Sequence, residues 1–258
     1  MRVDKEIKDY FLDIFSILDN KAKLSDLLNQ KELTHQEVYD WLSDIFDDWD
    51  FGEPCSIKEI PDIDFTFAQG ETKLVITIDD YRPIKTKFDG KFVIKIPFTD
   101  GSLDYCLREE KISEKVMDID YLKQFFALCF FAFEFYDKKV YVMERVEVDE
   151  FEEKGASRLI AYDREIMEQE GRTEEEIEES LEKNHSFYYG SDIYVTSEII
   201  KISYSSCDVE ELEIFMKNNK INDIHRQNIG FIEERPVIID YSGYFEGFCS
   251  YYNEEYSC

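Results

Sequence analysis

The stretch 220–243 holds the oxygen-bearing side chains whose types and spacing could do chemistry. Asp223 is followed five residues later by Asn228, and Asp240 comes twelve residues after that. Asp and Asn oxygens are hard ligands, suited to a Mg²⁺ ion that already holds phosphate oxygens. A further carboxylate beside such an ion can orient a hydroxyl group or accept its proton. Taken singly, each of these residues is also an ordinary turn former.

The apolar pattern around these residues indicates how they could be brought together. Two short apolar runs, 229–232 and 237–239, are separated by four residues that include a proline. Two such runs with a short connection predict a β-hairpin. The hairpin would place Asn228, just before one strand, close to Asp240, just after the other, with Asp223 on the loop before them. We therefore predict that the three side chains converge on one point.

The rest of the chain supplies the elements that must position this hairpin. Alternating apolar residues predict four strands, at 64–67, 73–78, 91–97 and 139–144. Helical spacing predicts two amphipathic helices within residues 1 to about 50, the second capped by Thr34 and Glu37. Further helices are predicted at 103–116, 173–183 and 209–216, and the apolar run 121–135 should be buried. This order of elements is typical of the α+β class.

The composition is strongly acidic, which bears on the partners that the chain could have. The 258 residues carry 30 Lys+Arg against 59 Asp+Glu, a net charge of −29. Such a surface repels phosphate backbones and anionic membranes, so we expect neither direct nucleic-acid binding nor membrane binding. The acidity could serve as a solvated surface, or it could imitate nucleic acid and occupy the basic groove of a host protein. Both interpretations stay open.

Cysteine and histidine usage argues against a zinc site and for a reducing compartment. None of the six cysteines has C-x-x-C spacing, and there are three histidines. The charged start of the chain does not have the pattern of a secretory signal. We therefore expect reduced thiols and a cytoplasmic location.

The pattern D-x-H-x-x-N at 223–228, followed by an apolar pair and D-x-x-G at 240–243, resembles the protein-kinase-like fold. It looks closest to the aminoglycoside and choline kinase branch and to kinase-like proteins of bacteriophages. The resemblance implies that Asp223 is the catalytic base, Asn228 a metal ligand and Asp240 the principal metal ligand, with ATP and Mg²⁺ as cofactors.

Further matches lie upstream in the same order as in that family. Residues 92–95 resemble the strand whose lysine grips the nucleotide phosphates, which implies this role for Lys95. The helix after this strand should supply a glutamate that holds the lysine. Glu109 fits best because an apolar residue follows it three positions later, and Glu110 and Glu114 are the alternatives.

Two more positions complete the resemblance. Met143 lies in the strand 141–146 that would meet the adenine through its backbone, and Gly70 lies where a loop would cover the phosphates. This loop has one glycine where the family uses two or three. Only residues 244–258 follow the D-x-x-G pattern, so the resemblance implies little about a platform for the acceptor substrate.

The resemblance implies a two-lobe architecture in three parts. We expect an N-terminal helical hairpin at 1–56, an antiparallel-sheet N-lobe at 57–147 and a reduced helical C-lobe with an acidic insertion at 148–258. The implied function is Mg-ATP binding with phosphotransfer to a hydroxyl acceptor, in a phage-encoded protein. The alternative is a catalytically inactive kinase-like protein that inhibits a host enzyme through its acidic surface, and a third interpretation is a virion or accessory protein.

Overall fold

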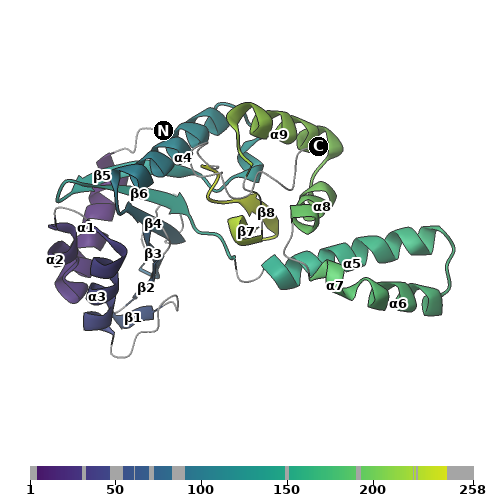
Figure 1. Ribbon diagram of the computed structural model, residues 1–258, viewed down its shortest axis with the longest axis horizontal. Coiled ribbons are helices and arrows are strands. Elements are labelled where there is room, and N and C mark those ends of the chain that lie inside the picture. Colours follow the sequence, from purple (N-terminus) through teal and green to yellow (C-terminus); the bar gives the residue numbers. More distant parts are fainter. Residues whose placement is uncertain are drawn as a thin grey trace. The chain divides into compact units, whose positions relative to one another are not determined.

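The structure is a computed structural model that describes residues 5–30, 33–46, 55–60, 62–69, 73–82, 91–148, 151–189, 193–222, 224 and 226–242. The chain divides into two compact units (Figure 1). Unit 1 comprises Met1–Lys115 and Leu128–Arg145, and unit 2 comprises Val116–Ala127 and Val146–Cys258. The chain therefore enters unit 2, returns to unit 1 and leaves it again two residues before the predicted boundary at 147. The N-terminal helices belong to the same unit as the sheet.

Unit 1 is built on a six-stranded antiparallel sheet, and the predicted α+β class is confirmed. Its strand order is β1-β2-β3-β4-β6-β5. The strands are β1 (Cys55–Ile60), β2 (Ile63–Gln69), β3 (Lys73–Asp80), β4 (Lys91–Pro97), β5 (Cys129–Phe135) and β6 (Lys138–Glu144). The four predicted strands lie in β2, β3, β4 and β6. β5 lies in the run that was predicted only to be buried, and β1 was not predicted.

One face of this sheet forms the main apolar core with three N-terminal helices (Figure 1). The helices are α1 (Lys5–Ala22), α2 (Leu24–Leu28) and α3 (His35–Ile45). Side chains two residues apart on a strand share a face, so Phe65 and Phe67 of β2 both enter this core. From α1, Phe11 and Phe15 pack into the same core. Two helices were predicted in this region, and α2 is an additional short helix. The apolar faces predicted for α1 and α3 are buried.

The predicted capping box of α3 is present. Thr34 Oγ1 accepts a hydrogen bond from the Glu37 backbone N–H at 3.3 Å, and Glu37 Oε2 accepts one from the Thr34 backbone N–H at 2.6 Å. The same helix is tied to α1 by the Trp41 ring N–H, which donates to the Ala22 carbonyl at 2.9 Å. These bonds satisfy backbone groups that the helix ends leave without helical partners.

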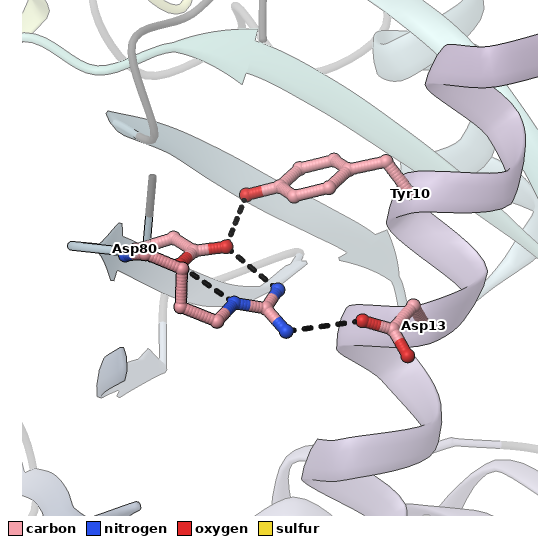
Figure 2. A network of polar contacts seen from close by, with 4 residues as sticks. Tyr10, Asp13 and Asp80 are labelled. Carbon is pink, nitrogen blue, oxygen red and sulfur yellow. Dashed lines mark hydrogen bonds and ion pairs between the residues drawn. The ribbon is translucent and has the colours of Figure 1, made fainter. Parts of the chain in front are cut away.

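A polar network fixes α1 to the last residue of β3 (Figure 2). Tyr10 donates to Asp80 Oδ2 at 2.9 Å, and the Arg82 guanidinium donates to both Asp80 oxygens at 2.9 and 2.7 Å. Arg82 also contacts Asp13 of α1 at 3.2 Å. Burial raises the pKa of Asp80, but the hydrogen bonds from Arg82 and Tyr10 outweigh burial, and the net pKa lies below its ordinary value.

Unit 2 is mainly helical and carries a two-stranded hairpin. Its helices are α5 (Phe151–Gln169), α6 (Glu174–Lys183), α7 (His185–Tyr188), α8 (Ile193–Ser203) and α9 (Ser206–Asn219), with short 3₁₀ helices at Lys123–Phe125 and Arg226–Asn228. The hairpin strands are β7 (Ile229–Ile232) and β8 (Arg235–Ile238). The predicted helices at 173–183 and 209–216 lie in α6 and α9. No helix among the described residues has both the length and the apolar character needed to cross a bilayer.

Candidate functional site

The face of the sheet opposite the main core carries the predicted lysine. Lys95 lies opposite Val75 of β3 and Tyr141 of β6 in the strand register. Lys73 stands two residues before Val75, so the strand period places it on the same face as Lys95. Three neighbouring strands therefore present two lysines and a tyrosine on one side.

The helix that follows β4, α4 (Asp100–Met117), places a carboxylate among these side chains. Glu109 Oε2 accepts a hydrogen bond from Lys95 Nζ at 3.0 Å, and Glu109 Oε1 accepts one from Lys73 Nζ at 3.2 Å. The Glu109 side chain is 0% exposed, and the side chains of Lys95 and Lys73 are 6% and 8% exposed. The predicted contact between Lys95 and Glu109 is confirmed. Lys73 is a second partner that the sequence analysis did not predict.

The two alternative glutamates of α4 do not take this place. Glu110 Oε1 accepts from the Phe131 backbone N–H at 3.3 Å, and Glu114 is exposed. Glu109 lies on the buried side of the helix because α4 is fixed to the sheet at the next turn, where Ser113 Oγ accepts from the Cys129 backbone N–H at 2.9 Å. The helix register thus selects one of the three candidates.

The groups beside this cluster are buried and protonated. Burial raises the pKa of the Cys129 thiol well above its ordinary value, and the charge of Glu109 raises it further. A protonated thiol is a poor nucleophile, so Cys129 serves packing. Burial also raises the pKa of Tyr141, and the charge of Glu110 adds to this effect. Within the described part of the chain, the buried Tyr141 hydroxyl has no hydrogen-bond partner.

Met143, the predicted contact for a base, lies inside β6. It is buried, and it is paired in register with Val93 of β4 on one side and Cys129 of β5 on the other. The backbone of Met143 therefore lies between two strands. Of the segment 141–146, only the residues after Glu144 lie outside the strand pairing. Arg145, the last residue of unit 1, contacts Asp79 of β3. The role of Met143 stays a prediction.

The predicted hairpin of unit 2 is present and brings two of the predicted site residues to the same end. Ile229 pairs with Ile238, and the Ile239 backbone N–H donates to the Asn228 carbonyl at 2.8 Å. Asn228 is buried and Asp240, one residue beyond this bond, is half-buried. The predicted hairpin is thus confirmed, and the convergence of the site side chains stays a prediction.

Asp240 is held in an unusual backbone conformation by its neighbours. Its φ is 50°, in the left-handed region that Asp tolerates better than most residues. The next side chain, Tyr241, is buried, stacks edge-on against Phe126 at 5.2 Å and donates to the Ala127 carbonyl at 2.9 Å. The turn at Asp240 is thereby fixed between β8 and this anchor.

A close backbone approach explains the glycine in β7. Glu147 pairs with Phe231, with the Glu147 backbone N–H donating to the Phe231 carbonyl at 2.8 Å and the reverse bond at 3.0 Å. A Cβ on Gly230 would lie 2.4 Å from Val146 Cγ1 and 2.8 Å from the Glu147 carbonyl oxygen. Only glycine lets the segment at 146–147 reach the hairpin this closely.

The remaining predicted site residues, Asp223 and Gly70, lie outside the described residues. In the described part of the chain, no group of three or more His, Cys, Asp or Glu side chains is arranged to hold a metal ion. The amide oxygen of Asn228 and the carboxylate of Asp240 are the donor types that Mg²⁺ takes. With substrate phosphates and water as further ligands, such a pair is chemically suitable for Mg²⁺.

Sequence reasoning missed Lys73 and Tyr141 because each looked like an ordinary strand residue. The signal for Lys73 was its position two residues before Val75, which places it on the same face of the sheet as Lys95 once β3 and β4 are paired. The signal for Tyr141 was its place directly opposite Lys95 once β4 and β6 are paired. Neither signal can be read before the strand order is known.

Comparisons of this chain with protein-family models, with curated proteins and with solved structures found no match in any of the three.

Proposed function

We propose that this chain is a kinase-like protein of two lobes that binds Mg-ATP and transfers a phosphoryl group to a hydroxyl acceptor. The observation that carries the proposal is the buried ion pair of Lys95 and Glu109, 3.0 Å apart, between a strand and the helix that follows it. The division into a sheet-based unit and a helical unit with a hairpin supports the two-lobe interpretation.

In the proposed site, each residue has a separate role. Lys95 contacts a phosphate oxygen, and Glu109 holds the lysine side chain in place. Asn228 and Asp240 hold the Mg²⁺ ion, which neutralises charge on the phosphates when it is bound. Asp223 orients the acceptor hydroxyl and accepts its proton. Positioning and electrostatic stabilisation supply the rate gain.

The build of the hairpin supports a binding role for its end. The chain fixes Asn228 through a backbone bond and Asp240 through the buried Tyr241 that follows it. A backbone that is held in place before the ligand arrives lowers the entropy lost on binding.

Thermal unfolding with and without ATP and Mg²⁺ tests this proposal. Ligand that binds the folded state raises the midpoint, so we expect a rise for the wild type that disappears in Asp240→Ala. Asp137→Ala is a matched control, because Asp137 also has a left-handed φ, 59°, but lies outside the proposed site. The control should keep the rise. No rise in the wild type at millimolar ATP with Mg²⁺ would contradict the proposal.

A second candidate function is favoured by the surface of unit 2. α6 carries six glutamates against one lysine, and the neighbouring helices α5 and α7 expose Tyr162 and Phe187. Acidic residues beside exposed aromatic rings suit a basic protein partner. The candidate is an inactive kinase-like protein that binds a host enzyme in the cytoplasm of a phage-infected bacterium, as a mimic of nucleic acid.

Capture from a bacterial lysate at low and high salt tests this second candidate. Attraction between exposed charges is screened as salt rises. A basic enzyme that is retained at low salt, released at high salt and lost when Tyr162 and Phe187 are replaced by serine would support it. Retention that is independent of salt and of both aromatic residues would contradict it.

A further inference from the structure

We propose that Lys73 is a second phosphate-binding residue, which contacts a phosphoryl group of the nucleotide other than the one that Lys95 contacts. This inference rests on the proposed function. It changes how the phosphates are held, because two side chains of the sheet then contact them.

The geometry of Glu109 separates the two lysines. Lys95 Nζ is bound to Oε2 and Lys73 Nζ to Oε1, so the ammonium groups flank the carboxylate from its two oxygens. A polyphosphate chain presents successive groups of oxygens along its length. Two cations that flank one carboxylate therefore suit neighbouring phosphoryl groups better than a single one.

The two lysines of the cluster offer positive charge to an anion. Lys73 and Lys95 each carry one positive charge, in a chain whose net charge is −29. Both side chains are buried, in a region that water hardly reaches. Electrostatic attraction to an anion is strong in such a medium of low polarity.

The residues of the cluster differ slightly in burial. The Glu109 side chain has no exposed surface, whereas Lys73 and Lys95 keep 8% and 6%. The lysines are therefore the residues of the cluster that keep some contact with solvent. The buried hydroxyl of Tyr141, directly across from Lys95 and without a partner among the described residues, is a further polar group on this face of the sheet.

The sequence before Lys73 explains why a side chain is needed there. The segment 70–73 has a single glycine. Loops that wrap phosphates through backbone N–H groups use several glycines, since a Cβ keeps the backbone away from the ligand. Lys73 is the first residue of β3, so its charge can supply a contact that a segment with one glycine is not expected to supply through its backbone.

A purely structural role for Lys73 is the rival explanation. In that case Lys73 holds Glu109, and Glu109 in turn holds Lys95, so loss of Lys73 would weaken only the phosphate contact that Lys95 makes. A direct role affects a different contact. The two explanations therefore differ in which phosphoryl group loses its contribution to binding.

Calorimetric titration with adenosine, AMP, ADP and ATP in the presence of Mg²⁺ separates them. The proteins are the wild type, Lys73→Met and Lys95→Met, with Lys91→Met, an exposed lysine of β4, as the control. Each of the first two variants leaves one lysine paired with Glu109, so they are matched in charge. We expect each substitution to lower ATP affinity about tenfold or more. The loss of affinity should first appear at a different member of the series AMP, ADP and ATP for each of the two variants. Adenosine affinity should be unchanged in both, and Lys91→Met should bind as the wild type does.

Three results would overturn the inference. If Lys73→Met binds ATP as tightly as the wild type does, Lys73 has no part in binding. If its loss falls on the same step as that of Lys95→Met, Lys73 acts only through Lys95. In both cases the proposed nucleotide site stands. If the wild type binds no member of the series, the proposed function fails together with the inference.

Acetylation of the wild-type protein tests the inference without a substitution, in case Lys73→Met does not fold. Lysine acetylation measured by peptide mass spectrometry should be slower at Lys73 with Mg-ATP than with Mg-adenosine. Lys91 is the internal reference and should react at the same rate in both. Equal rates at Lys73 with the two ligands would overturn the inference.

Discussion

The two ends of strand β3 carry charged clusters of opposite composition. At its first residue, Lys73 and Lys95 share the single carboxylate of Glu109 on the face covered by α4. At its last residue, the guanidinium of Arg82 and the hydroxyl of Tyr10 converge on Asp80, and Arg82 also contacts Asp13 of α1 (Figure 2). The ion pairs named here join two cations to one carboxylate at the first residue, and one cation to two carboxylates near the last.

This difference separates a structural cluster from a candidate for binding. The network of Asp80 links a helix to a strand, and its cation has a carboxylate on each side, so its contribution is to hold α1 in place. The cluster of Glu109 also links a helix, α4, to two strands, but it joins two lysines to one carboxylate in an acidic chain. The ion-pair distances in the two clusters are similar, but we propose a binding role only for the cluster of Glu109.

The largest effect is expected for Glu109→Gln. Removing the carboxylate leaves two buried ammonium groups without their shared partner, and breaking a buried ion pair lowers the free energy of unfolding by about 3–5 kcal/mol. Denaturant unfolding measures this loss. Glu114→Gln, an exposed glutamate of the same helix, should change the free energy of unfolding by less than about 0.5 kcal/mol. Equal effects of the two substitutions would contradict the burial argument.

A smaller effect is expected for Asp80→Asn. The side chain of Asp80 accepts charge-assisted hydrogen bonds from Arg82, and their loss should lower the free energy of unfolding by about 1–3 kcal/mol. Asp13→Asn is the control at the other side of Arg82. Asp13 is 58% exposed, and an exposed ion pair contributes about 1 kcal/mol or less. If Asp13→Asn lowers the free energy of unfolding as much as Asp80→Asn does, the exposed contact between Arg82 and α1 matters as much as the buried hydrogen bonds of Asp80, which would contradict the prediction.

The contribution of Asp80 should also depend on pH. The pKa of its carboxyl is lower in the folded state than its ordinary value of 3.8, so its stabilisation is fully present above that value. It is lost as the pH falls through the folded-state pKa. The difference in unfolding free energy between the wild type and Asp80→Asn should therefore be constant from pH 7 to about 5 and shrink below 3.8. If this difference in unfolding free energy grew as the pH fell, the prediction would be wrong.

The smallest effect is expected for Tyr141→Phe. The Tyr141 hydroxyl is buried, and among the described residues nothing pairs with it, so its removal breaks no hydrogen bond. Replacing an unsatisfied buried polar group by an apolar one is nearly neutral or stabilising. Unfolding experiments should show a change below about 0.5 kcal/mol or a gain. A loss above 1 kcal/mol would indicate a partner for this hydroxyl.

Local patterns predicted six of the eight described strands and the helices α1, α3, α4, α6 and α9, and they missed β1, β5 and the helices α2, α5, α7 and α8. They also predicted part of the site. Glu109 was preferred over Glu110 and Glu114 because an apolar residue follows it three positions later, and its contact with Lys95 joins a strand to the helix that directly follows it. The hairpin that brings Asn228 near Asp240 was likewise a local prediction. Both depend on contacts between segments close in sequence.

Contacts between distant segments were not predictable in the same way. Lys73 is 36 residues from Glu109, and their contact depends on strand order and on which face α4 covers. The close approach of residues 146–147 to Gly230 joins segments more than eighty residues apart. Such contacts follow from topology, which alternation within a single strand does not contain.

The measurement that tests the central claim most directly is calorimetric titration of ATP with and without Mg²⁺ into the wild type, Lys95→Met and Asp240→Asn. If Lys95 contacts phosphate and Asp240 holds the metal, Lys95→Met should weaken binding about tenfold in both conditions, and Asp240→Asn only when Mg²⁺ is present. Wild-type binding that neither substitution changes, or the absence of any binding by the wild type, would contradict the claim that these residues form a nucleotide site.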